Sequence, residues 1–399
     1  MIKKFLFVPL MVLAACGSKH NNSTDGFITV NLRDCVDKTT VTELADEIKD
    51  VSYVSLEMTD DNASLIDGVA NFVVSEKYIY VLPAKEMRVA LFSRSGKFIR
   101  TLIRQGQGPG EFSGTICNMQ LDEKNNKLYL FDIQDIWVYT TEGEFIEKKH
   151  HDYMSILSYE LADNKIGAIS FPFSPFDKTS FGMGIFTWDG KPVKTDNKMF
   201  YSPKLPKEKT GFTTDMAAVY SDFNSSILFK CGSNDTVYRI KSDVIEPAFS
   251  VKLENSDRQT VRALDVTDIM SMRTLEDKND MVVTDIMETN NSYYLRFRFN
   301  HTNHVAAINK KDGAVKVEKC LQPKEYMEMA GINILQGMSG TQSYKGFPIW
   351  GKVFGNTLVQ VITPYELSVY KDQVSISIPP ELQNVDEDGN PIFVFYLLK

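Results

Sequence analysis

A turn-and-strand pattern that recurs every 47 residues constrains this chain more than any other feature. The stretches ALFSRSGKFIR, WVYTTEGEFIE and GIFTWDGKPVK each place a glycine after an apolar run, at Gly96, Gly143 and Gly190. An aromatic residue lies four positions before each glycine: Phe92, Tyr139 and Phe186. A β-hairpin explains this pattern, because glycine adopts the positive φ that a tight turn between two strands requires.

Weaker copies of the same turn extend the repeat to six units. They lie at Ser242–Asp243, at Gly313 and near Asp372. A further strand candidate lies upstream of every turn, at 77–82, 127–132, 165–170, 226–231, 293–299 and 357–362. Several short strands per unit, at a period of about 45 residues, are typical of a β-propeller blade. The sequence therefore predicts an all-β fold, a six-bladed β-propeller, with a seven-bladed ring as the alternative.

Both ends of the chain carry apolar strand candidates that could close such a ring. They are FITVNL at 27–32 and PIFVFYLLK at 391–399. Closed blades avoid long exposed sheet edges, and closure usually joins a strand from one end of the chain to the sheet of the other. We therefore predict that the N-terminal strand at 27–32 completes the last blade.

Three segments are expected to form short helical insertions rather than blade strands. Residues 40–49 contain a capping box, and residues 257–277 carry apolar side chains at helical spacing without proline or glycine. Residues 323–330 begin with a proline at a position that favours the start of a helix.

The N-terminus has the pattern of a bacterial lipoprotein signal. Two lysines precede an apolar run of eleven residues, and Leu13-Ala14-Ala15 then leads into Cys16. The run is too short to span a membrane, which takes about 20 residues, and it suits the hydrophobic region of a signal peptide. An ordinary signal peptide with an incidental Cys16 is the alternative. The predicted domains are a signal peptide at 1–15, a lipidated tether at 16–26 and a single propeller at 27–399.

A lipid on Cys16 would make the membrane a partner and place the protein at the outer membrane. Several acyl chains give stable anchoring, whereas one chain binds only marginally. The residues after Cys16 lack an early acidic pair that resembles a surface-export signal. This favours the periplasmic side over the cell surface.

The formal net charge of −8 argues against a nucleic-acid-binding protein, because binding to a phosphate backbone requires a basic patch. The remaining four cysteines are scattered without a CxxC motif: Cys35, Cys117, Cys231 and Cys320. Free buried thiols are the favoured interpretation. A long-range disulfide to Cys35 is the alternative, since an exported protein meets an oxidising compartment.

The glycine-rich segment RQGQGPGE at 104–111 is the first candidate binding site. It lacks the Gly-Lys-Ser/Thr sequence opening a helix that a phosphate-binding loop requires. We interpret it as a crossing from the outer strand of one blade to the inner strand of the next. If the loop also reaches a propeller face, four residues would contact a ligand: Arg104, Gln105, Gln107 and Glu111.

No other motif carries a specific chemistry. Residues 384–389 resemble the first half of a calcium loop, but the twelfth position is Phe395 in place of the bidentate glutamate. Neither His150-His151 nor His301 with His304 forms a convincing metal site, and no hydrolase, metalloprotease or kinase signature is present. The sequence therefore predicts no metal and no cofactor, and its catalytic residues are unknown.

Four segments closely resemble the six-bladed β-propeller lipoproteins of Bacteroidota. They are IKDVSYVSLEMTDD at 48–61, GKFIRTLIRQGQGPGEF at 96–112, SNDTVYRIKSDVIEPAFSVKL at 233–253 and DEDGNPIFVFYLLK at 386–399. The GQGPGEF stretch is also similar to the repeats of NHL-type propellers. The resemblance implies the fold, a lipid anchor and a cell-envelope location. Some members of this family are similar to proteins found beside TonB-dependent nutrient transporters, which makes such a transporter an expected partner.

Two functions follow as hypotheses. The first is a lipid-anchored binding or scaffold protein of the cell envelope, with a small glycan or peptide as a candidate ligand. The second is a hydrolase or lyase that acts on glycan or peptide from a propeller scaffold. The fold alone does not decide between them.

Overall fold

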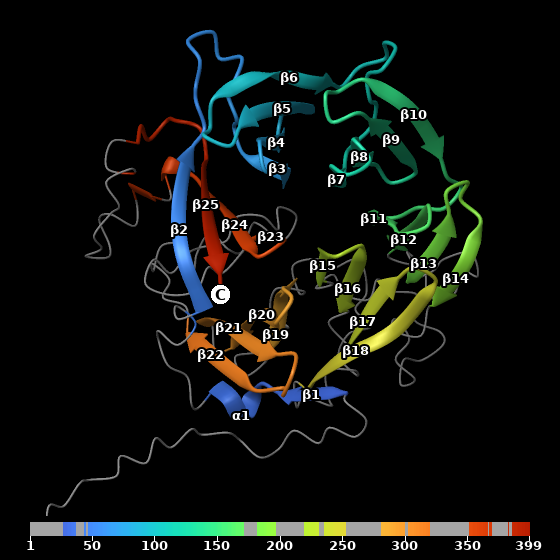
Figure 1. Cartoon of the computed structure of the whole chain (residues 1–399), viewed down its shortest axis with the longest axis vertical. Coiled ribbons are helices and arrows are strands. Elements are labelled where there is room, and N and C mark those ends of the chain that lie inside the picture. The colour runs from blue at the N-terminus through green and yellow to red at the C-terminus, as the bar shows by residue number, and fades with distance from the viewer. Residues whose placement is uncertain are drawn as a thin grey trace, which may run out of the picture.

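The computed structural model arranges six β-sheets around a ring, as the blades of a propeller (Figure 1). It describes residues 27–36, 44, 47–170, 182–196, 219–230, 235–252, 281–299, 302–319, 351–365, 367–368, 382 and 385–399. The predicted all-β fold and the count of six blades, rather than seven, are confirmed. Helix is scarce in the described part: α1 (Arg33–Val36) is one short helix, and residues 364–365 and 367–368 are also helical.

Each blade begins at the centre of the ring and ends at its rim (Figure 1). The first blade contains β3 (Val69–Val74), β4 (Tyr78–Pro83), β5 (Arg88–Ser93) and β6 (Phe98–Arg104). The second contains β7 (Asn118–Asp122), β8 (Lys127–Phe131), β9 (Asp135–Tyr139) and β10 (Phe145–His150). The third contains β11 (Leu157–Leu161), β12 (Lys165–Ile169), β13 (Met183–Thr187) and β14 (Pro192–Asp196).

The other three blades repeat this antiparallel order, and two of them recruit N-terminal strands. The fourth contains β15 (Val219–Phe223), β16 (Ser226–Lys230), β17 (Thr236–Lys241) and β18 (Val244–Lys252), with β1 (Ile28–Asn31) added parallel to β18. The fifth contains β19 (Val282–Glu288), β20 (Ser292–Phe299), β21 (Thr302–Asn309) and β22 (Val315–Lys319). The sixth contains β23 (Lys352–Phe354), β24 (Thr357–Ile362), β25 (Ile392–Leu398) and β2 (Ile48–Ser55). All six strand candidates upstream of the repeated turns form second strands, β4, β8, β12, β16, β20 and β24.

The repeated glycines form the turns that connect the third and fourth strands of the first three blades. Gly96, Gly143 and Gly190 have φ values of 84°, 83° and 81°. A side chain is costly there, because this left-handed region suits glycine and because a Cβ on Gly143 would lie 2.8 Å from the Leu102 Cγ. The fourth and fifth turns also contain positive φ values, 51° at Ser242 and 69° at Gly313. The turn expected near Asp372 lies outside the described residues.

The hydrophobic core is divided into clusters between neighbouring blades. Within β8, Leu128 and Leu130 pack in the cluster shared with the first blade, whereas Tyr129 and Phe131 pack in the cluster shared with the third. Alternate side chains of a strand point to opposite faces of its sheet, so a strand between two neighbours is apolar at every position. Each of the six blade interfaces holds one such cluster among the described residues.

The prediction for ring closure is wrong in its choice of strand. Residues 27–32 do not complete the last blade, because β1 lies on the outer edge of the fourth blade with Val30 buried beside the fifth. The last blade is closed by β2, which pairs antiparallel with β25 from Ile48 to Ser55. As an outer strand, β2 is buried on only part of its surface, so its sequence is less apolar than that of 27–32.

The helical insertions predicted at 257–277 and 323–330 lie outside the described residues, as do the signal peptide and Cys16. A helix is predicted at 40–49, but β2 begins at Ile48, so the prediction is wrong at the end of this segment. The Cys35 thiol donates a hydrogen bond to the Asn31 carbonyl oxygen at 3.3 Å, whereas Cys231 and Cys320 are not among the described residues. No helix of the described chain is long and apolar enough to cross a membrane.

Candidate functional site

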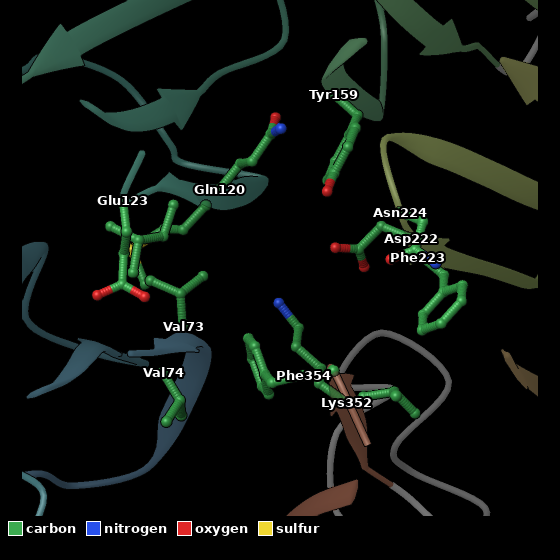
Figure 2. Close-up of a pocket in the computed structure, with 14 residues that line it drawn as sticks. Val73, Val74, Gln120, Glu123, Tyr159, Asp222, Phe223, Asn224, Lys352 and Phe354 are labelled. Atoms are coloured by element: carbon green, nitrogen blue, oxygen red, sulfur yellow. The ribbon is translucent and has the colours of Figure 1, made fainter. Parts of the chain in front are cut away.

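A cavity of about 200 Å³ lies among the innermost strands of the ring (Figure 2). Five blades contribute to its wall, through β3, β7, β11, β15 and β23 and the turns that follow three of these strands. Its polar lining residues are Gln120, Glu123, Tyr159, Asp222, Asn224 and Lys352. Pockets of 300–1,000 Å³ are usual for drug-sized ligands, so this volume suits a smaller molecule.

Lys352 is the cation of this cavity, and its side chain extends from the first residue of β23 toward the centre (Figure 2). Its Nζ donates to the Asn71 Oδ1 at 2.6 Å and to the Phe72 carbonyl oxygen at 3.2 Å. Both acceptors are neutral, and no described carboxylate forms an ion pair with this ammonium. Burial therefore lowers the pKa of Lys352, and the negative charge of Asp222 only partly opposes this.

Asp222 and Tyr159 face the cavity from the other side (Figure 2). Asp222 lies near the end of β15, and Tyr159 lies in the middle of β11 in the neighbouring blade. Burial raises the pKa of the Tyr159 hydroxyl, and the Asp222 carboxylate raises it further. The phenol therefore stays protonated and can donate a hydrogen bond toward the carboxylate or a ligand.

Side-chain amides bridge the inner strands, which do not pair with one another through their backbones. The Gln120 amide donates to the Glu160 carbonyl oxygen at 3.0 Å and accepts from the Glu160 N–H at 2.7 Å. The Asn118 amide donates to the Ser158 carbonyl oxygen at 3.1 Å. Because each amide has both donor and acceptor groups, it replaces part of a missing strand ladder. These bridges hold β7 and β11 at a fixed separation around the cavity.

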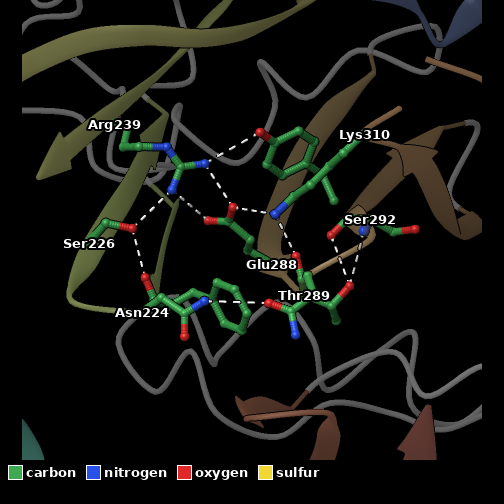
Figure 3. Close-up of polar contacts among 10 residues, drawn as sticks. Asn224, Ser226, Arg239, Glu288, Thr289, Ser292 and Lys310 are labelled. Atoms are coloured by element: carbon green, nitrogen blue, oxygen red, sulfur yellow. Dashed lines mark hydrogen bonds and ion pairs between the residues drawn. The ribbon is translucent and has the colours of Figure 1, made fainter. Parts of the chain in front are cut away.

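A buried ion cluster holds the turn that positions Asp222 (Figure 3). The Glu288 carboxylate accepts two hydrogen bonds from Arg239, at 2.7 and 3.0 Å, and one from Lys310 at 2.6 Å. Arg239 also donates to the Ser226 hydroxyl, which in turn donates to the Phe223 carbonyl oxygen at 2.7 Å. The fourth and fifth blades are thereby joined directly behind the cavity wall.

That turn contains two consecutive residues with positive φ, Asn224 at 48° and Ser225 at 54°. Such a pair is typical of the two-residue hairpin turn whose twist matches that of its strands. The Asn224 amide also donates to the Asn290 side-chain oxygen of the fifth blade at 3.5 Å. The sequence NSS at 224–226 therefore places Asp222 and Asn224 at the cavity.

The glycine-rich segment forms a compact loop that uses its own polar groups. The Gln105 amide donates to the Gly114 carbonyl oxygen at 2.8 Å. The Glu111 carboxylate accepts from the Gly108 N–H at 2.9 Å. A Cβ on Gly106 would lie 1.8 Å from the same carboxylate, so this close approach requires glycine. The loop connects β6 to β7, as expected for a crossing between blades.

The predicted ligand-binding residues of this loop lie away from the cavity. Arg104, Gln105 and Gln107 are exposed, Glu111 is half-buried, and none of the four lines the cavity. Gly110 packs against Phe145 on the outer strand β10, which places the loop at the rim. Ligand binding by these four residues stays a prediction.

The other candidate motifs contribute no described metal site. No group of three or more metal-binding side chains occurs in the described ranges. His150 instead pairs with Asp135 on the neighbouring strand, with 2.7 Å between its Nδ1 and the Asp135 Oδ1. The calcium-like segment forms a turn in which the Gly389 N–H donates to the Asp386 carbonyl oxygen.

Sequence reasoning missed the cavity residues because each comes from a different blade. Gln120, Asp222 and Lys352 lie far apart in the chain and belong to no contiguous motif. Their shared signal is a polar residue within the first strand of a repeat unit. Once those first strands are assigned to the ring centre, such residues become candidates.

Comparison with solved structures supports the fold. A crystal structure described as an exported protein of Bacteroides fragilis has 16% sequence identity and a TM-score of 0.63, over 90% of this chain and 98% of that one. The Family AA12 carbohydrate-active enzyme of Trichoderma reesei has 10% identity and a TM-score of 0.42, over 92% of this chain and 100% of that one. The first likeness shows a shared fold only, and the second carries no further argument. No curated protein matches the chain.

A family model gives the clearest assignment. The model for a domain of unknown function, DUF4934, matches residues 27–397, which is nearly the whole ring. The chain therefore belongs to the DUF4934 family.

Proposed function

We propose that this protein is a binding protein of the cell envelope that holds a small polar ligand in the central cavity of its propeller. The carrying observation is the Lys352 ammonium, which extends into a cavity without forming an ion pair with any described carboxylate. A buried charge without a counter-charge costs free energy unless something else compensates it. A polar ligand would supply that compensation.

The rigid surroundings support a binding role. Amide bridges from Gln120 and Asn118 fix neighbouring inner strands, and the Glu288 cluster fixes the turn beside Asp222. A site whose groups are already held in place loses little conformational entropy when it binds a ligand.

Export and a lipid anchor complete the proposal. The sequence MIKKFLFVPLMVLAAC supports lipidation at Cys16, and the Bacteroides fragilis relative of similar fold is described as exported. We propose attachment to the outer membrane, on its periplasmic side, with a TonB-dependent nutrient transporter as the partner. The partner proposal rests on the family resemblance of the sequence.

The binding role is tested by a thermal-shift screen of the purified full-length chain against small polar metabolites. Each hit is retested by calorimetry on Val73→Phe, which fills the cavity, and on Val193→Phe, a control on the exposed strand β14. We expect binding to be lost in Val73→Phe and kept in the control. Equal binding by wild type and both variants, or a screen without hits, would overturn the proposal.

The anchor and the partner are tested in cells. Radiolabelled palmitate should label the wild type but not Cys16→Ser, and the variant should leave the membrane fraction. A pull-down from detergent-solubilised membranes should recover a TonB-dependent transporter with the wild type. Recovery of the protein alone would refute the partner.

A further inference from the structure

The cavity presents opposite charges that do not neutralise each other. The Lys352 ammonium enters from the sixth blade, and the Asp222 carboxylate enters from the fourth (Figure 2). They interact through space, because Asp222 opposes the lowering of the Lys352 pKa, but they form no ion pair. The cavity therefore keeps a positive and a negative group apart, with solvent-sized space between them.

The hydrogen bonds of Lys352 show which side of it is available. An ammonium has three N–H donors. Two of them are directed at Asn71 and Phe72 in the first blade, which leaves one donor for the cavity. A carboxylate is the acceptor that would best match this donor, because a charge-assisted bond is about twice as strong as a neutral one.

The opposite wall is matched to a cation. Asp222 forms no ion pair with a described residue, and its carboxylate interacts with the neighbouring Tyr159 hydroxyl (Figure 2). Glu123 lies across the cavity from this wall, on the side of Val73 (Figure 2). An amine bound here would meet the negative charge of Asp222.

From these two walls we infer that the ligand is a small zwitterion, such as a free amino acid, whose carboxylate binds Lys352 and whose ammonium binds Asp222. This inference rests on the proposed binding function and names its ligand class. The cavity volume of about 200 Å³ corresponds to about seven water molecules at about 30 Å³ each, which admits a small amino acid. A neutral sugar would leave both charges without a counter-charge.

Single-charge analogues provide the test. Alanine, propionate, propylamine and glucose are titrated into the full-length chain by calorimetry. We expect alanine to bind at least about tenfold more tightly than propionate or propylamine, because each analogue loses one charge-assisted bond. Glucose is expected not to bind.

Two variants test which cavity residue binds each end of the ligand. Lys352→Met should abolish the binding of propionate but not that of propylamine. Asp222→Asn should abolish the binding of propylamine but not that of propionate. Lys97→Met and Asp243→Asn remove the same charges at exposed turns and should change neither affinity. Circular dichroism of each variant checks that the propeller is folded, and the nearly isosteric Asp222→Asn gives an independent result if Lys352→Met does not fold.

The outcomes separate this inference from the broader proposal. If glucose binds in the cavity, or if propionate binds as well as alanine, the zwitterion is excluded while a binding function survives. If none of the probes binds and the metabolite screen also yields no ligand, both fail. Alanine binding that is unchanged in both cavity variants would also refute the inference.

Discussion

Replacing Glu288 by alanine should destabilise the propeller strongly, although this residue lies outside the cavity. Its carboxylate is 3% exposed and is shared by two cations, Arg239 and Lys310 (Figure 3). Removal leaves both cations partly buried without a counter-charge. Breaking a buried ion pair in this way costs about 3–5 kcal/mol, because an unpaired charge remains in a medium of low polarity.

The contacts of the Glu288 carboxylate narrow the expected loss of unfolding free energy. Three hydrogen bonds to the carboxylate are lost, each of which would contribute about 1.5–3 kcal/mol in a charged pair. Part of this loss is offset, because Arg239 keeps its bonds to Ser226 and Tyr293 and Lys310 keeps its bond to the Thr289 carbonyl oxygen. We therefore expect Glu288→Ala to lower the free energy of unfolding by about 3–4 kcal/mol.

Urea denaturation followed by tryptophan fluorescence measures this loss. Glu142→Ala is the matched control, because its pair with Arg100 is exposed and should contribute less than about 1 kcal/mol. A triple variant, with Arg239→Leu, Glu288→Met and Lys310→Met, removes all the charges and should recover most of the stability. The explanation would be refuted by a loss below about 1 kcal/mol in Glu288→Ala, or by no recovery of stability in the triple variant, because the unpaired cations would then not cause the loss.

Three further predictions concern other sites. Burial raises the pKa of the Asp285 carboxyl to about 7, so the folded chain retains a proton that the unfolded chain releases near its ordinary pKa of 3.8. The free energy of unfolding should therefore fall as pH rises between these values, by at most about 4 kcal/mol, and urea titrations of Asp285→Asn should lack this fall. Gly143→Ala should lower the free energy of unfolding by about 2–3 kcal/mol, because the new Cβ would lie 2.9 Å from the Leu102 carbonyl oxygen. Gly355→Ala is the control in the same assay, and it should lower this free energy by about 1 kcal/mol, because no atom lies within 4 Å of its Cβ. Burial raises the pKa of the Cys117 thiol to about 11, so iodoacetamide at pH 8 should label this thiol far more slowly in the folded than in the urea-unfolded chain, as read by mass spectrometry of its peptide.

The ring was predictable because its defining constraints are local. A turn that needs a positive φ selects glycine, and the spacing of Gly96, Gly143 and Gly190 is the length of one blade. Strands packed between two blades are apolar at every position, as in the YIYVLP sequence of β4. Both signals can be recognised in a single sequence, since neither depends on a residue elsewhere in the chain.

The closing strand was mispredicted because closure depends on distant partners. The segment at 27–32 is more apolar than β2, yet its Val30 is buried between the fourth and fifth blades. β2 contributes Val54 to the interface between the sixth and first blades and Ile48 to that between the fifth and sixth. Apolar density shows that a strand will be buried, but it does not show which blade will bury it.

The cavity could not be predicted from the sequence, because its residues also come from distant parts of the chain. The distance between Lys352 and Asp222 along the chain is 130 residues, and only the circular order of the blades brings them to one cavity. A lysine at the start of one strand and an aspartate near the end of another each resemble ordinary solvated residues. Once the first strand of every unit is known to be the inner one, a charged residue on that strand must lie near the ring centre or an inner turn. Polar residues on first strands are therefore the positions at which other sequences of this family should be searched for candidate cavity residues.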